Sequence, residues 1–218
     1  MKLIAFQYGK TELAENIIFR NFKSDAKKTI SLLFFLLETE DKKLLIDVGC
    51  DTMPGFPIFE FENPTVLLEK NEISPDDITD IFITHSHHDH IDCLRHFKNA
   101  VIYIQEKEYE SGKKYFVNGN KVVSFEEQYR FNDFVTFKKI AGHTYGSSIA
   151  IIENDGEKYV LCGDECYSIL NFERKIPNGS IINLENNENF IKNYRFGFNK
   201  IIFHDKDLVG EIGTKVIF

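Results

Sequence analysis

The stretch ITHSHHDHIDC, residues 83–93, holds four of the seven histidines of this 218-residue chain within six positions. Its spacing, H-x-H-x-D-H, follows the apolar run DIFIT, which is typical of a buried strand. His85 and His87 can therefore leave the strand end in an extended loop and face one ion. Asp89 and His90 begin the next helical turn and point to a neighbouring position. A divalent ion accepts such donors, and four of them within six residues can serve two metal sites.

Apolar runs separated by turn residues organise the rest of the chain. The runs 29–39 and 44–49, joined by the polar turn EDKK, predict a hairpin of buried strands. Ser74 as N-cap, followed by Pro75 and by Asp77 in the capping-box position, predicts a short helical turn. The further predicted strands cover residues 80–84, 100–105, 133–141, 147–154, 158–164 and 199–205, and the predicted helices are EKEYESGKK and LENNENFIKNYRFG. Strands in groups with helices between them imply a layered α/β architecture.

Three ligand-type residues follow apolar strands far from the histidine cluster. His143 lies in AGHTYGS, where glycines allow close approach of the backbone. Asp164 ends the strand KYVLCGD, and His204 ends the strand NKIIFHD. Open α/β sheets place their sites at the carboxyl ends of strands, so the metal hypothesis extends to all three.

The series THSHHDH, GHTYGS, GD and a late histidine resembles the metallo-β-lactamase superfamily of dinuclear hydrolases. The resemblance covers nearly the whole chain and implies one domain, residues 1–218, folded as a four-layer αββα sandwich with two divalent ions at one edge. It implies seven metal ligands: His85, His87 and His143 for one ion, Asp89, His90 and His204 for the other, and Asp164 as the bridge. Zinc is the expected metal, although iron and manganese accept the same ligand types.

Three further residues near these motifs are not expected to be metal ligands. The resemblance gives Asp47, in LLIDVG, the role of orienting a ligand histidine, and a turn residue beside Gly49 is the alternative. His88 and His96 match no ligand position, so we expect them to be structural or solvated.

This fold hosts many reactions, so the branch of the superfamily has to be inferred from individual residues. His87 stands where oxygen-reducing diiron members carry glutamate, and Tyr167 follows Asp164 by three positions, as in N-acyl homoserine lactonases. The resemblance to these lactonases implies hydroxide attack on a lactone or ester of small size. In it, Tyr167 would stabilise the oxyanion and Asp89 would take or return a proton. Ordinary helix packing is the alternative for Tyr167.

Other functions stay open on the sequence. A glyoxalase II-like thioester hydrolase uses the same ligand types, and Lys192, Arg195 and Lys200 loosely match its basic glutathione-binding set. A phosphodiesterase or nuclease of the same superfamily is a further alternative, and a metal-binding protein without catalysis comes last.

The segment MPGFPIFEF, residues 53–61, follows the strand that carries Asp47. Its large apolar side chains either line an acyl groove beside the metals or pack in the core; they are Met53, Phe56, Phe59 and Phe61.

Composition limits the partners and the compartment. With 26 basic and 34 acidic residues the formal charge is −8, which argues against nucleic-acid binding. The four cysteines form no C-x-x-C pair and indicate reduced thiols. The N-terminus lacks a signal-peptide core, and the longest apolar run, LLFFLL, is too short to span a membrane. We therefore expect a soluble cytoplasmic protein.

Overall fold

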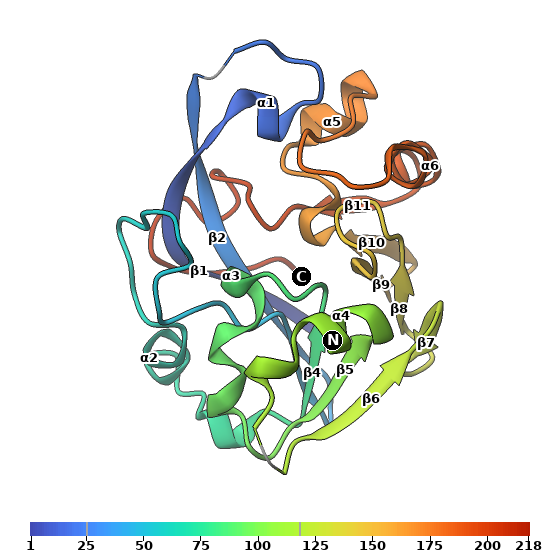
Figure 1. The fold of residues 1–218 in the computed structure, drawn as a ribbon. Coiled ribbons are helices and arrows are strands. Elements are labelled where there is room, and N and C mark those ends of the chain that lie inside the picture. Colours follow the sequence, from blue (N-terminus) through green and yellow to red (C-terminus); the bar gives the residue numbers. More distant parts are fainter. Residues whose placement is uncertain (25, 118) are drawn as a thin grey trace.

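Two β-sheets pack face to face in the computed structural model, which describes residues 1–24, 26–117 and 119–218 (Figure 1). The larger sheet has the order β12-β1-β2-β3-β4-β5-β6, with bounds β1 (Lys2–Ala14), β2 (Lys27–Glu38), β3 (Lys43–Ile46), β4 (Asp80–Ile83), β5 (Val101–Gln105), β6 (Lys121–Phe125) and β12 (Gly213–Val216). The smaller sheet has the order β11-β10-β9-β8-β7, with bounds β7 (Gln128–Arg130), β8 (Val135–Lys139), β9 (Ser148–Asn154), β10 (Glu157–Leu161) and β11 (Asn199–Ile201).

Helices cover the outer face of each sheet. The α-helices are α1 (Glu15–Ile18), α2 (Pro64–Glu69), α3 (His88–Ile91), α4 (Glu106–Ser111), α5 (Ile169–Arg174) and α6 (Leu184–Tyr194). The 3₁₀ turns are η1 (Pro75–Asp77), η2 (Asp92–His96), η3 (Lys113–Tyr115) and η4 (Gly163–Glu165). Leu68 of α2 packs on the larger sheet, and Phe172 of α5 and Phe190 of α6 pack on the smaller one. The expected αββα arrangement is confirmed.

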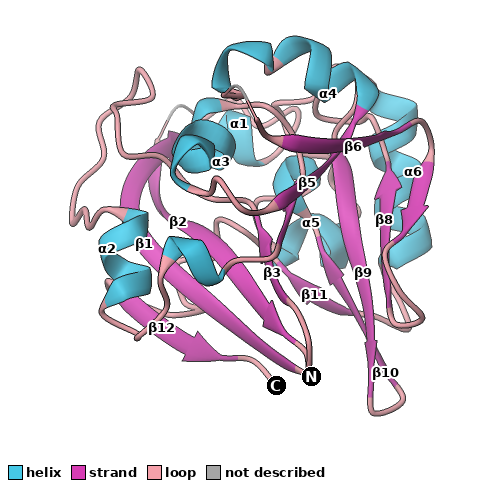
Figure 2. Ribbon diagram, turned by 90° about the horizontal axis from the view of Figure 1, so that it is seen from below, coloured by secondary structure: helices cyan, strands magenta, loops and turns pink. Residues whose placement is uncertain are grey.

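Burial on both faces explains the unbroken apolar run of β2. Leu33 and Phe35 face the smaller sheet, whereas Phe34 and Leu36 share a core with the outer helices. A strand covered on both sides needs no alternation of polar and apolar residues. Figure 2 shows β1 and β2 side by side as long strands, with both chain ends near the N-terminal end of β1. Among the helices of the described segments, none combines the length and the apolarity that crossing a bilayer requires.

Local signals in the sequence predict several element ends correctly. The stretch NDGE between the predicted strands 147–154 and 158–164 is typical of a hairpin turn. Asp155 and Gly156 both have positive φ, 51° and 80°, as a two-residue type I′ turn between β9 and β10 requires. The capping box of Ser74 and Asp77 is present, and Gly112 is the C-cap residue that follows α4. Strands β1, β6, β7 and β12 have no counterpart among the predicted strands. Strand β1 mixes charged with apolar residues, and in the other three most side chains are not buried.

Five strand ends meet at one edge of the sandwich. Strands β3 and β4 pair in parallel, and so do β10 and β11, so each pair presents its carboxyl ends together. Strand β8 runs antiparallel to β9, as β10 does, so β8 also ends at this edge. The loops after these strands carry every ligand-type residue that the sequence singles out.

The contact between Phe82 of β4 and Phe137 of β8 joins the two sheets, with ring centroids 4.1 Å apart and both side chains fully buried. We expect Phe82→Ala to lower the free energy of unfolding by about 3–5 kcal/mol, because it leaves a cavity between the sheets. Phe134→Ala is the control, since Phe134 is 56% exposed, and should cost within about 0.5 kcal/mol. Denaturant unfolding of both variants measures the difference; equal losses would contradict this packing.

Candidate active site

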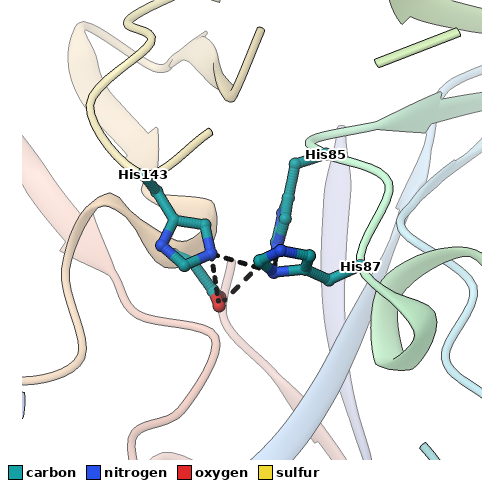
Figure 3. Close-up of side chains that lie close together, drawn as sticks. His85, His87 and His143 are labelled. Atoms are coloured by element: carbon teal, nitrogen blue, oxygen red, sulfur yellow. Dashed lines mark hydrogen bonds and ion pairs between the residues drawn. The ribbon is translucent and has the colours of Figure 1, made fainter. Parts of the chain in front are cut away.

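Three imidazoles and one carboxylate oxygen converge at the sheet edge. Figure 3 shows the rings of His85, His87 and His143 turned toward one another. The Nδ1 atom of His87 lies 3.0 Å from Nε2 of His85 and 3.0 Å from Nε2 of His143. Asp164 Oδ2 lies 3.4 Å from Nε2 of His143 and 3.7 Å from Nε2 of His85. We call these three histidines, with Asp164 Oδ2, the first donor group.

A second set of donors faces the other oxygen of the same carboxylate. Asp164 Oδ1 lies 2.9 Å from Nε2 of His204 and 3.2 Å from Nε2 of His90. Asp89 Oδ2 lies 3.6 Å from Nε2 of His90. We call Asp89, His90 and His204, with Asp164 Oδ1, the second donor group. The structure thus brings all seven expected ligands together, with Asp164 between the two groups.

The outer nitrogens of two rings are held by backbone carbonyls. Nδ1 of His143 lies 2.5 Å from the Ser180 carbonyl oxygen, and Nδ1 of His204 lies 2.9 Å from the Ser31 carbonyl oxygen. A carbonyl oxygen only accepts, so Nδ1 donates in each ring. In the neutral form of each ring the lone pair is then on Nε2, the atom nearest Asp164, where a metal ion would bind.

Asp47 holds both the end of β4 and a ring of the second donor group. Its carboxylate accepts from Thr84 N at 2.7 Å and from Thr84 Oγ1 at 2.8 Å, and it lies 2.6 Å from Nδ1 of His90. Thr84 Oγ1 in turn lies 3.1 Å from Nδ1 of His85. Asp47 also has φ 57° at the end of β3. It is therefore both the residue that contacts a ligand histidine and the turn residue that the sequence left as the alternative.

The donor set fits a divalent cation on its chemistry. Nε2 of His90 is buried and makes no hydrogen bond within the described residues, although Asp164 Oδ1 is near. Burial lowers the pKa of His85 well below its ordinary value, which favours the neutral imidazole. Burial opposes ionisation of Asp164, but His204 and His90 bring the pKa of its carboxyl well below its ordinary value. Burial opposes the charged form of His90 and His204, but Asp164 raises the pKa of both above the ordinary value, so an ion bound there would displace a proton. Each donor group could hold one ion.

Tyr167 lies directly against the Asp164 carboxylate. Its hydroxyl donates to Asp164 Oδ2 at 2.9 Å, and its ring stacks on His204 with centroids 5.1 Å apart. The side chain is 7% exposed and lines a cavity of about 680 Å³ together with His204. Tyr167 also packs among apolar side chains of α1 and β2, so packing and contact with the donor groups occur together.

His88 and His96 belong to neither donor group. Nδ1 of His88 lies 3.0 Å from the Tyr115 hydroxyl, and its Nε2 lies 3.0 Å from the Thr52 carbonyl oxygen. His96 pairs with Asp51 at 2.8 Å. Both rings thus make structural contacts, as expected.

A cavity of about 860 Å³ opens beside both donor groups and is lined by His87, Asp89 and His143. Phe56 and Ile182 contribute apolar wall, so one phenylalanine of the segment 53–61 does line the pocket. The others do not line it and none is in the core; they are Met53, 62% exposed, Phe59, 38%, and Phe61, 39%.

Two buried carboxylates next to the donor groups are absent from the residues that the sequence singled out. Glu108 is 2% exposed and Glu165 is fully buried, and both accept hydrogen bonds from the loops that carry the ligands. Glu108 lies in a charged stretch of α4, a pattern typical of a solvated helix face. The only sequence signal for Glu165 is its place directly after Asp164.

We expect two divalent ions per chain when metal-replete protein is examined by elemental analysis, because seven donors exceed what one tetrahedral ion can use. The substitution Asp164→Ala should weaken the binding of both ions, because each donor group loses one carboxylate oxygen. The loss should exceed the roughly 10–100-fold typical of residues that only orient a ligand. One ion or none in the parent protein, or two tightly held ions in Asp164→Ala, would contradict the shared centre.

Comparison with known proteins agrees with this geometry. The model of the metallo-beta-lactamase superfamily matches residues 33–171. An N-acyl homoserine lactonase of Agrobacterium fabrum is 26% identical over 143 residues, which are 55% of this chain and 52% of that protein. A probable metallo-hydrolase of Methanocaldococcus jannaschii is 36% identical over 111 residues, which are 50% of this chain and 48% of that protein. The chain thus spans about half the length of these curated relatives.

Solved structures extend the similarity of fold over the whole chain. A crystal structure of a quorum-quenching N-acyl homoserine lactone lactonase superposes with a TM-score of 0.84 and 21% identity. The superposition covers 96% of this chain and 97% of that one. At this identity the likeness concerns the fold, whereas the family model matches more than half of the sequence. The chain therefore belongs to the metallo-beta-lactamase superfamily.

Proposed function

We propose that the chain is a metal-dependent hydrolase that cleaves a small lactone or ester. The observation that carries the proposal is the Asp164 carboxylate, which presents one oxygen to each donor group beside an open cavity. The two donor groups would each hold a divalent ion, with zinc the expected metal for this His/Asp set. Similarity to N-acyl homoserine lactonases supports a carbonyl substrate.

Bound divalent ions would make water acidic enough to act as a nucleophile near neutral pH and would polarise a carbonyl oxygen. The protein supplies the remaining parts. The cavity beside His87 and His143 holds the substrate, and Phe56 offers it an apolar wall. Asp89 lines the same cavity, so its carboxylate can carry a proton to the leaving alkoxide.

Tyr167 is the proposed donor to the oxyanion. Burial and the neighbouring Asp164 raise the pKa of its hydroxyl well above the ordinary value, so the phenol keeps its proton at neutral pH. The hydroxyl lies 2.9 Å from Asp164 Oδ2 and would donate to a carbonyl oxygen bound between the two donor groups, although Tyr167 itself lines the cavity of about 680 Å³ and not the one that His87 and His143 line.

The basic residues of the thioesterase alternative lie elsewhere. Lys192 and Arg195 line a separate cavity of about 420 Å³, and none of the seven donor residues lines it. Lys200 directs its ammonium to the Arg195 carbonyl oxygen at 2.6 Å. These basic residues thus do not line the cavity beside the donor groups, which favours the lactone or ester.

Tyr167→Phe tests the proposal, because it keeps the ring and removes one hydroxyl donor. We expect turnover of an N-acyl homoserine lactone, or of the best ester, to fall about 100- to 1,000-fold. Metal content should stay at the parent value. Tyr159→Phe is the matched control, since Tyr159 packs on Phe218 away from the donor groups, and it should keep full turnover. Parent-like turnover in Tyr167→Phe, with stability intact, would return Tyr167 to a packing role.

A further inference from the structure

The loop between β8 and β9, residues 140–147, is held by two buried carboxylates although it carries a single ligand, His143. We call it the His143 loop. Glu165 Oε1 accepts from Gly142 N at 3.0 Å, from His143 N at 3.1 Å and from Ser147 Oγ at 2.5 Å. Glu165 thus holds the backbone at and just before His143 and a side chain four residues after it, and it follows directly after Asp164.

Glu108 holds the same loop from the other side. Its Oε1 accepts from Thr144 Oγ1 at 2.7 Å and from Gly146 N at 2.8 Å. Its Oε2 accepts from the backbone N and from Oγ of Ser86, both at 2.8 Å. Ser86 lies between His85 and His87 in the chain, so Glu108 ties the loop of these two ligands to the loop of the third.

The loop approaches these side chains closely enough to require glycine. A Cβ atom at position 142 would collide with Glu165 Oε2, and a Cβ atom at 146 would collide with the side-chain oxygen of Gln105. Asn187 of α6 donates to the other carboxylate oxygen, Glu165 Oε2, at 2.9 Å and so helps to fix the Glu165 side chain. Of the glycines that the sequence suggested for close backbone approach, Gly142 therefore serves the contact with Glu165, and Gly146 serves the approach to Gln105 and Glu108.

The contacts of the second donor group come from other residues. His90 is held by Asp47 and His204 by the Ser31 carbonyl oxygen, and neither contact involves Glu108 or Glu165. We infer that Glu108 and Glu165 are positioning residues that set the affinity of one ion only, the ion of the first donor group. The inference rests on the proposed two-metal centre and not on the identity of the substrate.

A carboxylate suits this role because every atom that faces it is a donor. Glu108 receives two backbone N–H groups and two hydroxyls, two donors at each oxygen. In Glu108→Gln one oxygen becomes an NH₂ group, which must face a backbone N–H that cannot accept. One of the two ligand loops then has to move, and the three histidines no longer converge.

Titration of metal-free protein with Zn²⁺ against a chromophoric chelator tests the inference, because it resolves the two binding steps without any substrate. In the parent protein we expect two ions. In Glu108→Gln the zinc affinity of one binding step should fall by about 10–100-fold, the range typical of residues that orient ligands. The affinity of the other step should stay within about threefold of the parent value. Glu106→Gln is the matched control, an exposed glutamate of the same helix, and should leave both steps unchanged.

The double variant Glu108→Gln/His204→Ala identifies which step is affected. His204→Ala removes a ligand of the second donor group, so by itself it should weaken a single step. If Glu108 acts on the first donor group, the double variant should weaken both steps. If the double variant weakens only the step that His204→Ala weakens, or if Glu108→Gln leaves both steps at parent values or weakens them equally, the inference is overturned.

Ser86→Ala gives a milder form of the same test if Glu108→Gln does not fold. It removes one of the four donors to Glu108 and leaves the backbone N–H in place. The same zinc step should weaken, by less than in Glu108→Gln, while the unfolding midpoint of the metal-free protein is unchanged. If the Ser86→Ala and Glu165→Gln proteins both fold and both bind zinc as the parent protein does, the inference is overturned.

Discussion

The carboxylate of Asp164 is the interaction on which the rest of the site depends. It lies among four imidazoles, with His204 and His90 at one oxygen and His85 and His143 at the other, where the Tyr167 hydroxyl also donates. Burying that many ring nitrogens with one carboxylate is costly unless a cation joins them, because buried polar groups need partners. The sandwich makes the arrangement possible, since parallel strand ends from both sheets meet at one edge and the inter-sheet core keeps them in place.

The seven donor residues could be predicted because each leaves a local mark. Four of them stand in one short motif, and His143, Asp164 and His204 each follow an apolar strand. The tight turn at Asp155–Gly156 and the capping box at Ser74 could be predicted for the same reason, since their chemistry acts within a few residues.

Glu108 and Glu165 could not be predicted, because their roles depend on residues far along the chain. Glu108 looks like one more charge on a polar helix, and only the folded chain places it between Ser86 and the His143 loop, 38 residues away from Gly146. The strand β1 could not be predicted for a related reason. The Oε1 atom of its buried Gln7 accepts from Ser31 Oγ on β2 at 2.9 Å, a contact that a sequence pattern does not reveal.

The central claim is that this centre hydrolyses a lactone or an ester in a metal-dependent way. The most direct measurement is kcat/KM of the metal-replete protein on an N-acyl homoserine lactone, an aryl ester, a glutathione thioester and a phosphodiester, repeated after chelation and after return of Zn²⁺. The account predicts the highest value for the lactone or the ester, its loss on chelation and its recovery with zinc. A preference for the thioester or the phosphodiester, or hydrolysis that survives complete removal of metal, would contradict it.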